Sequence, residues 1–169
     1  MSVKIRTTLR IEGSLLIVMA VSMIIPLLIA FFERETGSIR AFLLVMAMCV
    51  ILGLIPFIFF GPSQRKIQSR DSFVIVTLSW VLASIIGALP FLLSGSMNSF
   101  ADAFFESVSG FTTTGSSILT DVEVLPRSIL FWRSFPHWLG GLGIIVFITA
   151  LLPVFGINGQ LIANSETTG

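Results

Sequence analysis

The residues of this chain that could do chemistry lie in one stretch, Phe104 to Gly115, which reads FFESVSGFTTTG. Long apolar segments precede and follow it. A short helical run ends near Gly110, and three β-branched threonines and Gly115 come next. Exposed backbone is tolerated at membrane depth only where it is buried in protein or lines a wet cavity. The stretch therefore suggests a re-entrant loop whose backbone carbonyls face a dehydrated ion.

The residue types in this loop suit a monovalent cation. Threonine favours extended backbone, and Gly115 permits the positive φ that turns a carbonyl toward an axis. Consecutive residues offer such carbonyls: Thr112, Thr113, Thr114, Gly115 and, at the mouth, Ser116. Neutral carbonyls can replace a hydration shell and still release the ion, so we expect K⁺ or Na⁺ rather than a divalent ion. The alternative is a polar external loop after an interfacial helix.

The composition places the whole chain in the membrane class. Of 169 residues, 54% are hydrophobic and 11% are charged, whereas a soluble domain carries about 25% charged residues. We therefore expect an all-α integral membrane protein in a lipid bilayer. The sequence shows no acid–base pair, activated nucleophile or phosphate-cradling loop, so we do not expect an enzyme. The net charge of +1 gives no indication of a nucleic-acid partner, and the single cysteine, Cys49, supports neither a disulfide nor a metal site.

Apolar runs long enough to cross a bilayer, which takes about 20 residues, set the expected elements. Four spans are predicted: Ser14–Phe32, Ala41–Phe60, Ser72–Leu93 and Ser128–Leu152. Between the last two we expect a half-length helix at about Ser99–Ser109. Its length of roughly 15 Å, at 1.5 Å per residue, is half of a bilayer core. Ser99 and Asp102 resemble a capping box at its start, and Gly110 is a plausible stop.

The basic residues near the span ends predict an orientation. One side of the alternating spans carries most of them: Lys4, Arg6, Arg10, Arg65, Lys66 and Arg70. The other side carries Arg34, Arg40 and Arg127, diluted by acidic neighbours. The positive-inside rule makes the first side cytoplasmic. Both termini of this chain are then cytoplasmic, and the half-length helix enters from outside.

Two ionisable residues, Glu106 and Arg133, lie close to membrane depth, where a charge is costly unless it is paired or hydrated. One interpretation makes them a salt bridge that braces the half-length helix against the fourth span. The other leaves each residue at the wet outer face. The only histidine, His137, has no second metal ligand nearby in the sequence, so we expect a hydrogen-bonded packing role for it.

The stretch FADAFFESVSGFTTTGSS, followed by LPRSILFWRSFPHWLGGLGIIV, resembles the first pore repeat of the TrkH-type potassium uptake proteins, in the Trk/Ktr/HKT superfamily. RDSFVIV and GALPFLLSG, in the third span, resemble the preceding part of the same pattern. The resemblance implies two leading helices and then four membrane–pore–membrane repeats around one ion path. It also implies K⁺ coordination at Thr113, Thr114 and Gly115, with K⁺ as the transported ion and no covalent cofactor.

The same resemblance implies a cell inner membrane location, a homodimer of the full-length protein and a cytoplasmic nucleotide-binding regulatory subunit of the TrkA kind. The chain departs from the family in length, because only one repeat is present. We expect leading helices at 1–70, the first repeat at 71–155, and at 156–169 a cytoplasmic linker toward a missing second repeat. A potassium uptake protein of which this is a fragment is the favoured function. A small homotetrameric cation channel and a non-conducting assembly or regulatory subunit are the alternatives.

Overall fold

The protein is described by a computed structural model that covers residues 2–61 and 69–151, with side chains for 5–61 and 72–145. The regular elements in these ranges are helices, which agrees with the predicted all-α class. In chain order they are α1 (Ser2–Ser22), α2 (Ile24–Phe32), α3 (Thr36–Phe59), α4 (Ser69–Leu93), α5 (Phe100–Phe111) and α6 (Arg127–Leu151). The predicted linker at 156–169 and the basic side chains of Lys4, Arg65, Lys66 and Arg70 lie outside the described residues and side chains.

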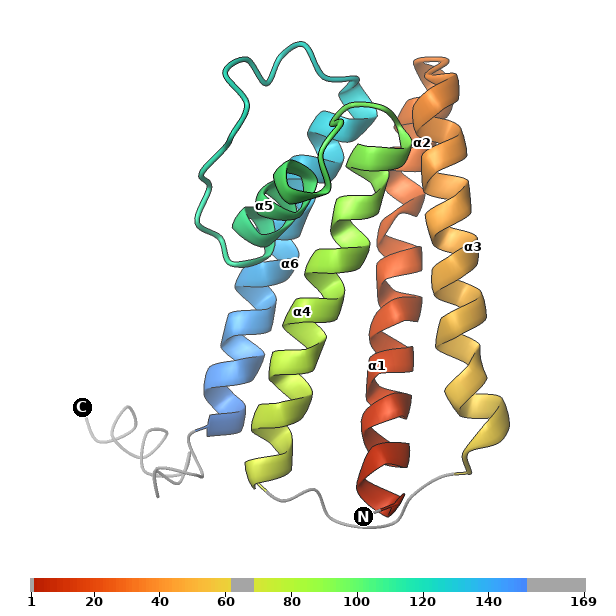
Figure 1. Ribbon diagram of the computed structural model, residues 1–169, viewed down its shortest axis with the longest axis vertical. Helices are drawn as coiled ribbons and strands as arrows, with labels where there is room; N and C mark the ends of the chain where they lie inside the picture. The colour runs from red at the N-terminus through yellow and green to blue at the C-terminus, as the bar shows by residue number, and fades with distance from the viewer. Residues whose placement is uncertain (1, 62–68, 152–169) are drawn as a thin grey trace, which may run out of the picture.

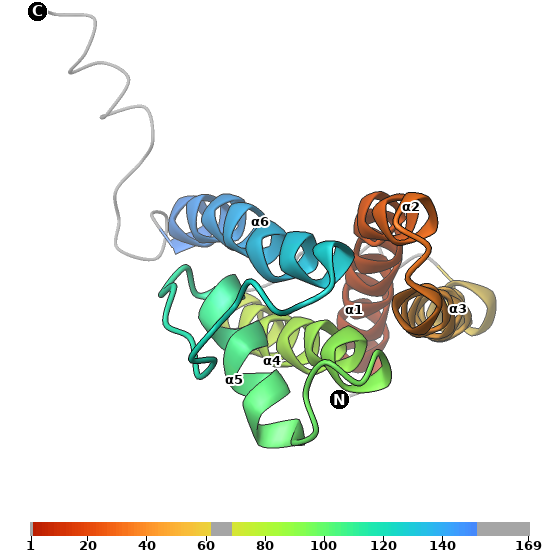
Figure 2. The same ribbon diagram turned by 90° about the horizontal axis from the view of Figure 1, so that it is seen from above.

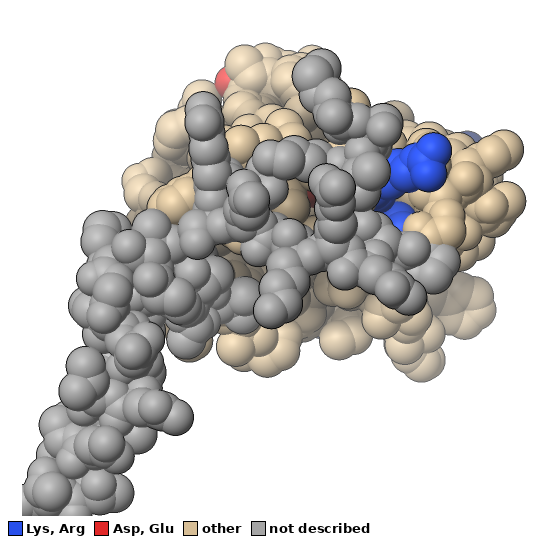
Figure 3. Space-filling view, turned by 90° about the horizontal axis from the view of Figure 1, so that it is seen from below, with Lys and Arg blue, Asp and Glu red and all other residues tan. Residues whose placement is uncertain are grey.

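The long helices α1, α3, α4 and α6 run along one bundle, and the short α5 crosses its upper half (Figure 1). Seen from above, α4 lies in the middle, with α1–α3 on one side and α5 and α6 on the other (Figure 2). Figure 3 shows basic side chains at the lower end. The guanidinium groups of Arg6 and Arg10 lie there over the rings of Phe60 and Phe57, at 6.0 and 5.0 Å.

Three segments of the described residues are long and apolar enough to cross a membrane: Ile5–Phe32, Thr36–Phe59 and Ser72–Leu93. The first contains a break at Met23 between α1 and α2. Pro26 causes it, because proline has no N–H to donate to the carbonyl of Ser22. The predicted fourth span coincides with α6, which has 25 residues. It is not among the three because polar residues, including Arg133 and His137, lower the hydropathy of its described part, so a fourth crossing stays a prediction.

Small residues allow α1 and α3 to pack closely. A β-carbon on Gly13 would lie 2.7 Å from the carbonyl oxygen of Gly53, and one on Gly53 would lie 2.9 Å from that of Gly13. Glycines at such a crossing let two membrane helices approach until their backbones touch. The leading helices therefore form a tightly packed pair.

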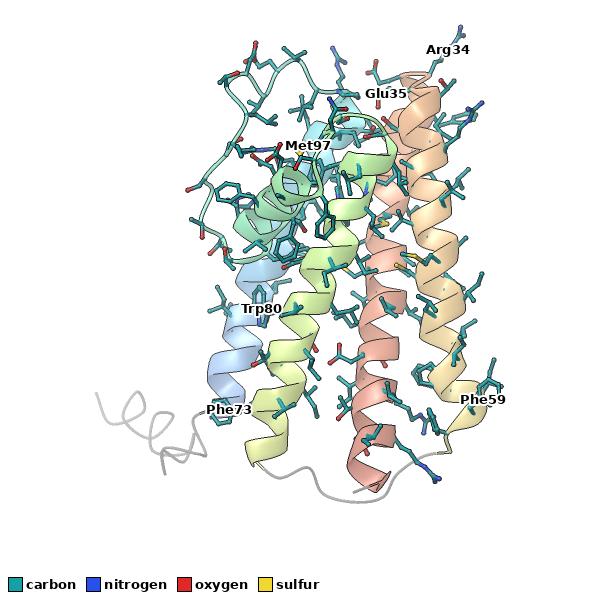
Figure 4. The ribbon with its side chains drawn as sticks, in the orientation of Figure 1. Arg34, Glu35, Phe59, Phe73, Trp80 and Met97 are labelled. Atoms are coloured by element: carbon teal, nitrogen blue, oxygen red, sulfur yellow. The ribbon has the colours of Figure 1, made fainter. Side chains whose placement is uncertain are left out.

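Polar contacts tie this leading pair to the rest of the bundle at two levels. At the upper end, Arg127 Nη1 donates to Glu33 Oε1 at 2.9 Å, and the Ser128 hydroxyl donates to Glu35. Figure 4 shows Glu35 at this end of the bundle. In the lower half, the Ser79 hydroxyl donates to Glu12 Oε1 at 2.9 Å. The contacts join α1 and the α2–α3 turn to α4 and α6.

The three helices α4, α5 and α6 meet at Gly87. The fully buried Trp132 donates its indole N–H to the Gly87 carbonyl at 2.9 Å. A β-carbon on Gly87 would lie 2.5 Å from Ser107 Oγ and 2.7 Å from Phe111 Cε2. The absence of a side chain at Gly87 therefore lets the carboxyl end of α5 settle between its two neighbours.

Two predicted details of the half-length helix are wrong. Ser99 is the N-cap residue, but its side chain makes no capping hydrogen bond, so the capping box with Asp102 does not form. Asp102 still lies in the first turn, where its charge suits the positive end of the helix dipole. The helix also continues through the predicted stop, Gly110, to Phe111. A β-carbon on Gly110 would lie 3.1 Å from Pro136 Cβ, so this glycine serves close packing against α6.

Candidate functional site

The site is built at the carboxyl end of α5, which lies part-way down the bundle (Figure 1). Here the chain reverses and climbs back to the upper end before α6 begins. The carboxyl end of a helix carries roughly half a negative elementary charge. The Thr112–Ser116 loop therefore begins at a point of negative potential, and its residues are exposed.

A Schellman motif closes the helix. The Thr114 amide donates to the Ser109 carbonyl and the Thr113 amide donates to the Gly110 carbonyl, both at 3.0 Å. Such a motif requires a left-handed residue, usually glycine, and here that residue is Thr113, with φ +59°. A β-branched residue in this region is strained by an amount of order 1–3 kcal/mol. The expectation of extended backbone is therefore wrong for Thr113, and also for Thr112, which is helical at φ −80° and ψ 0°.

Gly115 has the positive φ that the sequence predicted, at +76°. The four successive amides of Thr112–Gly115 all donate back to carbonyls at the end of α5, over 2.8 to 3.4 Å. Within residues 2–61 and 69–151, no hydrogen bond is made to the carbonyl oxygens of these four residues. The loop therefore has its donors engaged and its acceptors available, which is the arrangement that a cation needs.

The threonine hydroxyls and Ser116 contribute to the loop in a different way. Thr112 Oγ1 donates to the Val108 carbonyl and lies 2.8 Å from Thr114 Oγ1. The Ser116 carbonyl accepts a hydrogen bond from Ser109 Oγ at 2.6 Å. Ser116 thus closes the loop onto α5, whereas the four carbonyls before it remain available.

Glu106 organises the segment that returns from the loop. Its side chain is 1% exposed, and its Oε2 accepts from Arg133 Nε at 2.8 Å. Its Oε1 accepts from the Ser117 hydroxyl at 2.6 Å and from the Ile118 amide at 2.7 Å. Of the two interpretations of Glu106 and Arg133, the structure shows the salt bridge. One carboxylate thus connects α5, α6 and the chain immediately beyond the loop.

One face of α6 contacts α5 and the loop at successive turns. Arg133 reaches Glu106, and the His137 ring follows one turn later. Nδ1 of His137 would lie 3.8 Å from a β-carbon on Gly110, and its Nε2 would lie 3.9 Å from one on Gly115. Gly140, another turn on, lies against Phe111. The spacing of these three α6 residues places them on one helical face.

Sequence reasoning missed several residues that shape the site: Ser109, Ser117, Gly87 and the pairing of Gly140 with Phe111. Gly87 and Gly140 carried a signal, since glycines in a membrane helix indicate close approach. The serines gave none, because their hydrogen bonds depend on how the loop folds back. His137 is half-buried beside the loop, and its predicted hydrogen bond is not found among the described residues.

Comparisons with known proteins agree with this architecture. The family model for TrkH, described as a cation transport protein, matches residues 38–169. The chain is 40% identical over 168 residues to the Trk system potassium uptake protein TrkH of Salmonella typhimurium, and equally so to that of Escherichia coli K12. Each alignment covers 97% of this chain and 34% of the relative. The chain thus spans about a third of the length of these relatives.

A solved structure is also similar. The crystal structure of the potassium transporter TrkH from Vibrio parahaemolyticus superimposes with a TM-score of 0.83 at 38% sequence identity. The match covers 97% of this chain and 36% of that one. The arrangement of α1–α6 is therefore one that a potassium transporter contains as part of a longer chain.

Proposed function

This chain belongs to the TrkH family of cation transport proteins, and we propose that it supplies one of four filter strands in a potassium uptake protein. The observation that carries the proposal is the loop after α5, with the amides of Thr112–Gly115 engaged and their carbonyls available. Potassium sheds its water where a ring of carbonyl oxygens replaces the hydration shell. In this proposal Thr113, Thr114 and Gly115 coordinate K⁺.

The surroundings of the loop support a cation rather than an anion. The negative end of the α5 dipole points toward it. Glu106 and Arg133, which lie beside the loop, neutralise each other at 2.8 Å. We propose that this pair braces α5 against α6 and holds the returning chain in place. The loop then offers partial charges, which bind a monovalent ion weakly enough to release it.

One strand cannot surround an ion, so the proposal requires further strands. Because the chain spans about a third of its relatives, we propose that they come from further repeats of a longer protein. In that arrangement 1–70 leads, 71–155 is the first repeat and 156–169 continues toward the second. We further propose an inner-membrane location with both of these termini cytoplasmic, a dimer of the complete protein, and a TrkA-like nucleotide-binding partner. A homotetramer of short chains remains the second candidate.

A chimera tests the proposal. The corresponding third of Escherichia coli TrkH is replaced by these 169 residues and expressed in a host without its own potassium uptake. We expect growth at low potassium and rubidium uptake from the chimera, and neither from the 169 residues alone. Robust potassium-dependent growth from the short chain alone would instead support the homotetramer. A chimera that inserts at normal levels but carries no ion would contradict a conducting role.

A further inference from the structure

A buried carboxyl group lies inside the first candidate span, on a different helix from the loop. Glu12 belongs to the apolar segment Ile5–Phe32 and is 9% exposed. Its Oε1 accepts the Ser79 hydroxyl at 2.9 Å. Its Oε2 is buried and has no hydrogen-bond partner among the described residues. An ionisable residue within a membrane span marks a candidate functional site, because a charge there is costly unless it is paired or hydrated.

No described cation compensates Glu12. On its own helix, the guanidinium groups of Arg6 and Arg10 lie over phenylalanine rings of α3 and its end. The ionisable residues of α3 are Arg40, near its opposite end, and the thiol of Cys49. On α4, Arg70 and Asp71 have side chains outside the described set. The salt bridges among the described side chains join other residues.

A cavity adjoins Ser79, the hydrogen-bond partner of Glu12, and extends to Phe111 at the end of α5. It has a volume of about 340 Å³ and lies between α1, α4, α6 and the end of α5. Ser79, which holds Glu12, forms part of its wall, and the rest is mainly apolar, including Leu15, Trp80 and Phe111. Figure 4 shows Trp80 on the side of α4 that faces α6. The cavity suits apolar molecules better than hydrated ions.

The described side chains favour a proton over a metal ion as the ligand of Glu12. Hard cations such as Ca²⁺ take about six to eight oxygen ligands. Among the described residues, the carboxyl has one hydrogen-bond partner, the Ser79 hydroxyl, and the adjoining cavity is lined mainly by apolar side chains. The described residues also contain no group of three or more metal-binding side chains. A proton needs only the one unpartnered oxygen.

We propose that Glu12 is a proton-binding site within the membrane-spanning part of the protein. Oε2 carries the proton, and Oε1 accepts the Ser79 hydroxyl, so that α1 and α4 meet through a neutral pair. The proposal is independent of which ion the chain carries. The proton site formed by Glu12 and Ser79 is separate from the proposed ion-binding loop, Thr112–Gly115.

Carbodiimide labelling tests the proposal. Membranes containing the protein are treated at neutral pH with dicyclohexylcarbodiimide, which adds to a protonated carboxyl and leaves its whole mass on the residue as an N-acylurea. Peptide mass spectrometry locates the label. We expect it on Glu12 and not on the exposed Asp121, with no label at this position in Glu12→Gln. In the Ser79→Ala variant, Glu12 should still be labelled, because the proton lies on Oε2 and Ser79 contacts Oε1.

Matched measurements make the result decisive. A water-soluble carbodiimide should modify exposed acids and spare Glu12. Glu12→Gln replaces a neutral acid by a neutral amide, so its thermal stability in detergent should match that of the parent. The proposal is overturned if dicyclohexylcarbodiimide spares Glu12, or if K⁺ or Na⁺ protects Glu12 at constant pH and ionic strength. A large loss of stability in Glu12→Gln would also overturn it, because it would indicate an ionised carboxylate.

Discussion

The α-carbon of Gly140 lies against the carbonyl group of Phe111, where α6 crosses the end of α5. A β-carbon on Gly140 would lie 2.7 Å from the carbonyl carbon of Phe111 and 3.1 Å from its Cα. Phe111 is the last residue of α5, immediately before Thr112. The position of the loop is therefore set by backbone contact with α6, and no side chain can be inserted without moving one of the two helices.

We expect Gly140→Ala to displace the end of α5. Overpacking of this kind costs about 1–3 kcal/mol, so the apparent melting temperature in detergent should fall and rubidium uptake by the chimera should decrease. Gly141→Ala is the matched control, because no atom lies within 4 Å of a β-carbon there. Equal losses from both substitutions would show that the Phe111 contact does not position the loop.

We expect Glu106→Gln to be strongly destabilising. Its partner Arg133 is 17% exposed, and removing one member of a buried ion pair costs about 3–5 kcal/mol. The same substitution also perturbs the carboxylate oxygen that accepts hydrogen bonds from the Ser117 hydroxyl and the Ile118 amide. Thermal unfolding in detergent measures the effect.

Glu33→Gln provides the comparison for that experiment. It breaks an ion pair with a similar N···O distance, 2.9 Å, but the side chains of Arg127 and Glu33 are 77% and 41% exposed. Exposed pairs contribute about 0–1 kcal/mol, so little should change. If the two variants unfold alike, Glu106 does not brace the site.

Gly115→Ser should weaken the discrimination of K⁺ over Na⁺ in the chimera. Only His137 Nε2 lies near a β-carbon there, at 3.9 Å, so the side chain has room and the strain comes from φ +76°. Thr114→Val removes one hydroxyl, keeps the backbone shape and should matter much less. Competition between rubidium and sodium uptake measures both. If Thr114→Val has the larger effect, the hydroxyl is the ligand and the carbonyl account is wrong.

Gly95→Ser separates the geometry of the proposed filter loop from general backbone strain. Gly95 also has φ +76° and has no atom within 4 Å of a β-carbon, but it lies in the turn after α4. We expect Gly95→Ser to leave ion selectivity unchanged. If Gly95→Ser lost as much selectivity as Gly115→Ser, backbone strain elsewhere in the chain would explain both effects, and the geometry of the proposed filter loop would not.

Cysteine labelling should confirm the orientation. The native Cys49 is fully buried, and Cys49→Ala removes any background. In that background an impermeant reagent applied outside intact cells should label Thr36→Cys, because Thr36 is exposed at the upper end. Lys66→Cys should react only after the membrane is made permeable. The opposite pattern would invert the topology.

The long helices were predictable because each contains a long apolar run bounded by charged or turn-forming residues, although Arg133 and His137 interrupt the run of α6. The predicted third span, Ser72–Leu93, and α4, Ser69–Leu93, end at the same residue. The positive φ of Gly115 was predictable too, because glycine is the residue that most readily adopts this conformation in a turn after a helix. These features depend on neighbours within a few residues, which the sequence displays directly.

The rest depends on residues that are distant in sequence. Gly110 packs against Pro136 inside the helix, and the left-handed position falls on Thr113 instead, which local turn preferences do not show. Glu12 follows a basic stretch and looks like an interfacial charge until Ser79, 67 residues away, is found beside it. Packing between helices therefore determines the conformation of Thr113 and the burial of Glu12, which local sequence preferences do not predict.

The link between the α2–α3 turn and α6 has a consequence for how the protein is made. Arg127 follows Glu33 by 94 residues, and Ser128 follows Glu35 by 93. At a synthesis rate of about 5–20 residues per second, Arg127 and Ser128 are made roughly 5 to 20 s after Glu33 and Glu35. During that interval the two leading helices can already be packed through Gly13 and Gly53. Ribosome stalling before residue 127 should therefore yield an intermediate in which α1 and α3 are packed together but do not yet contact α6.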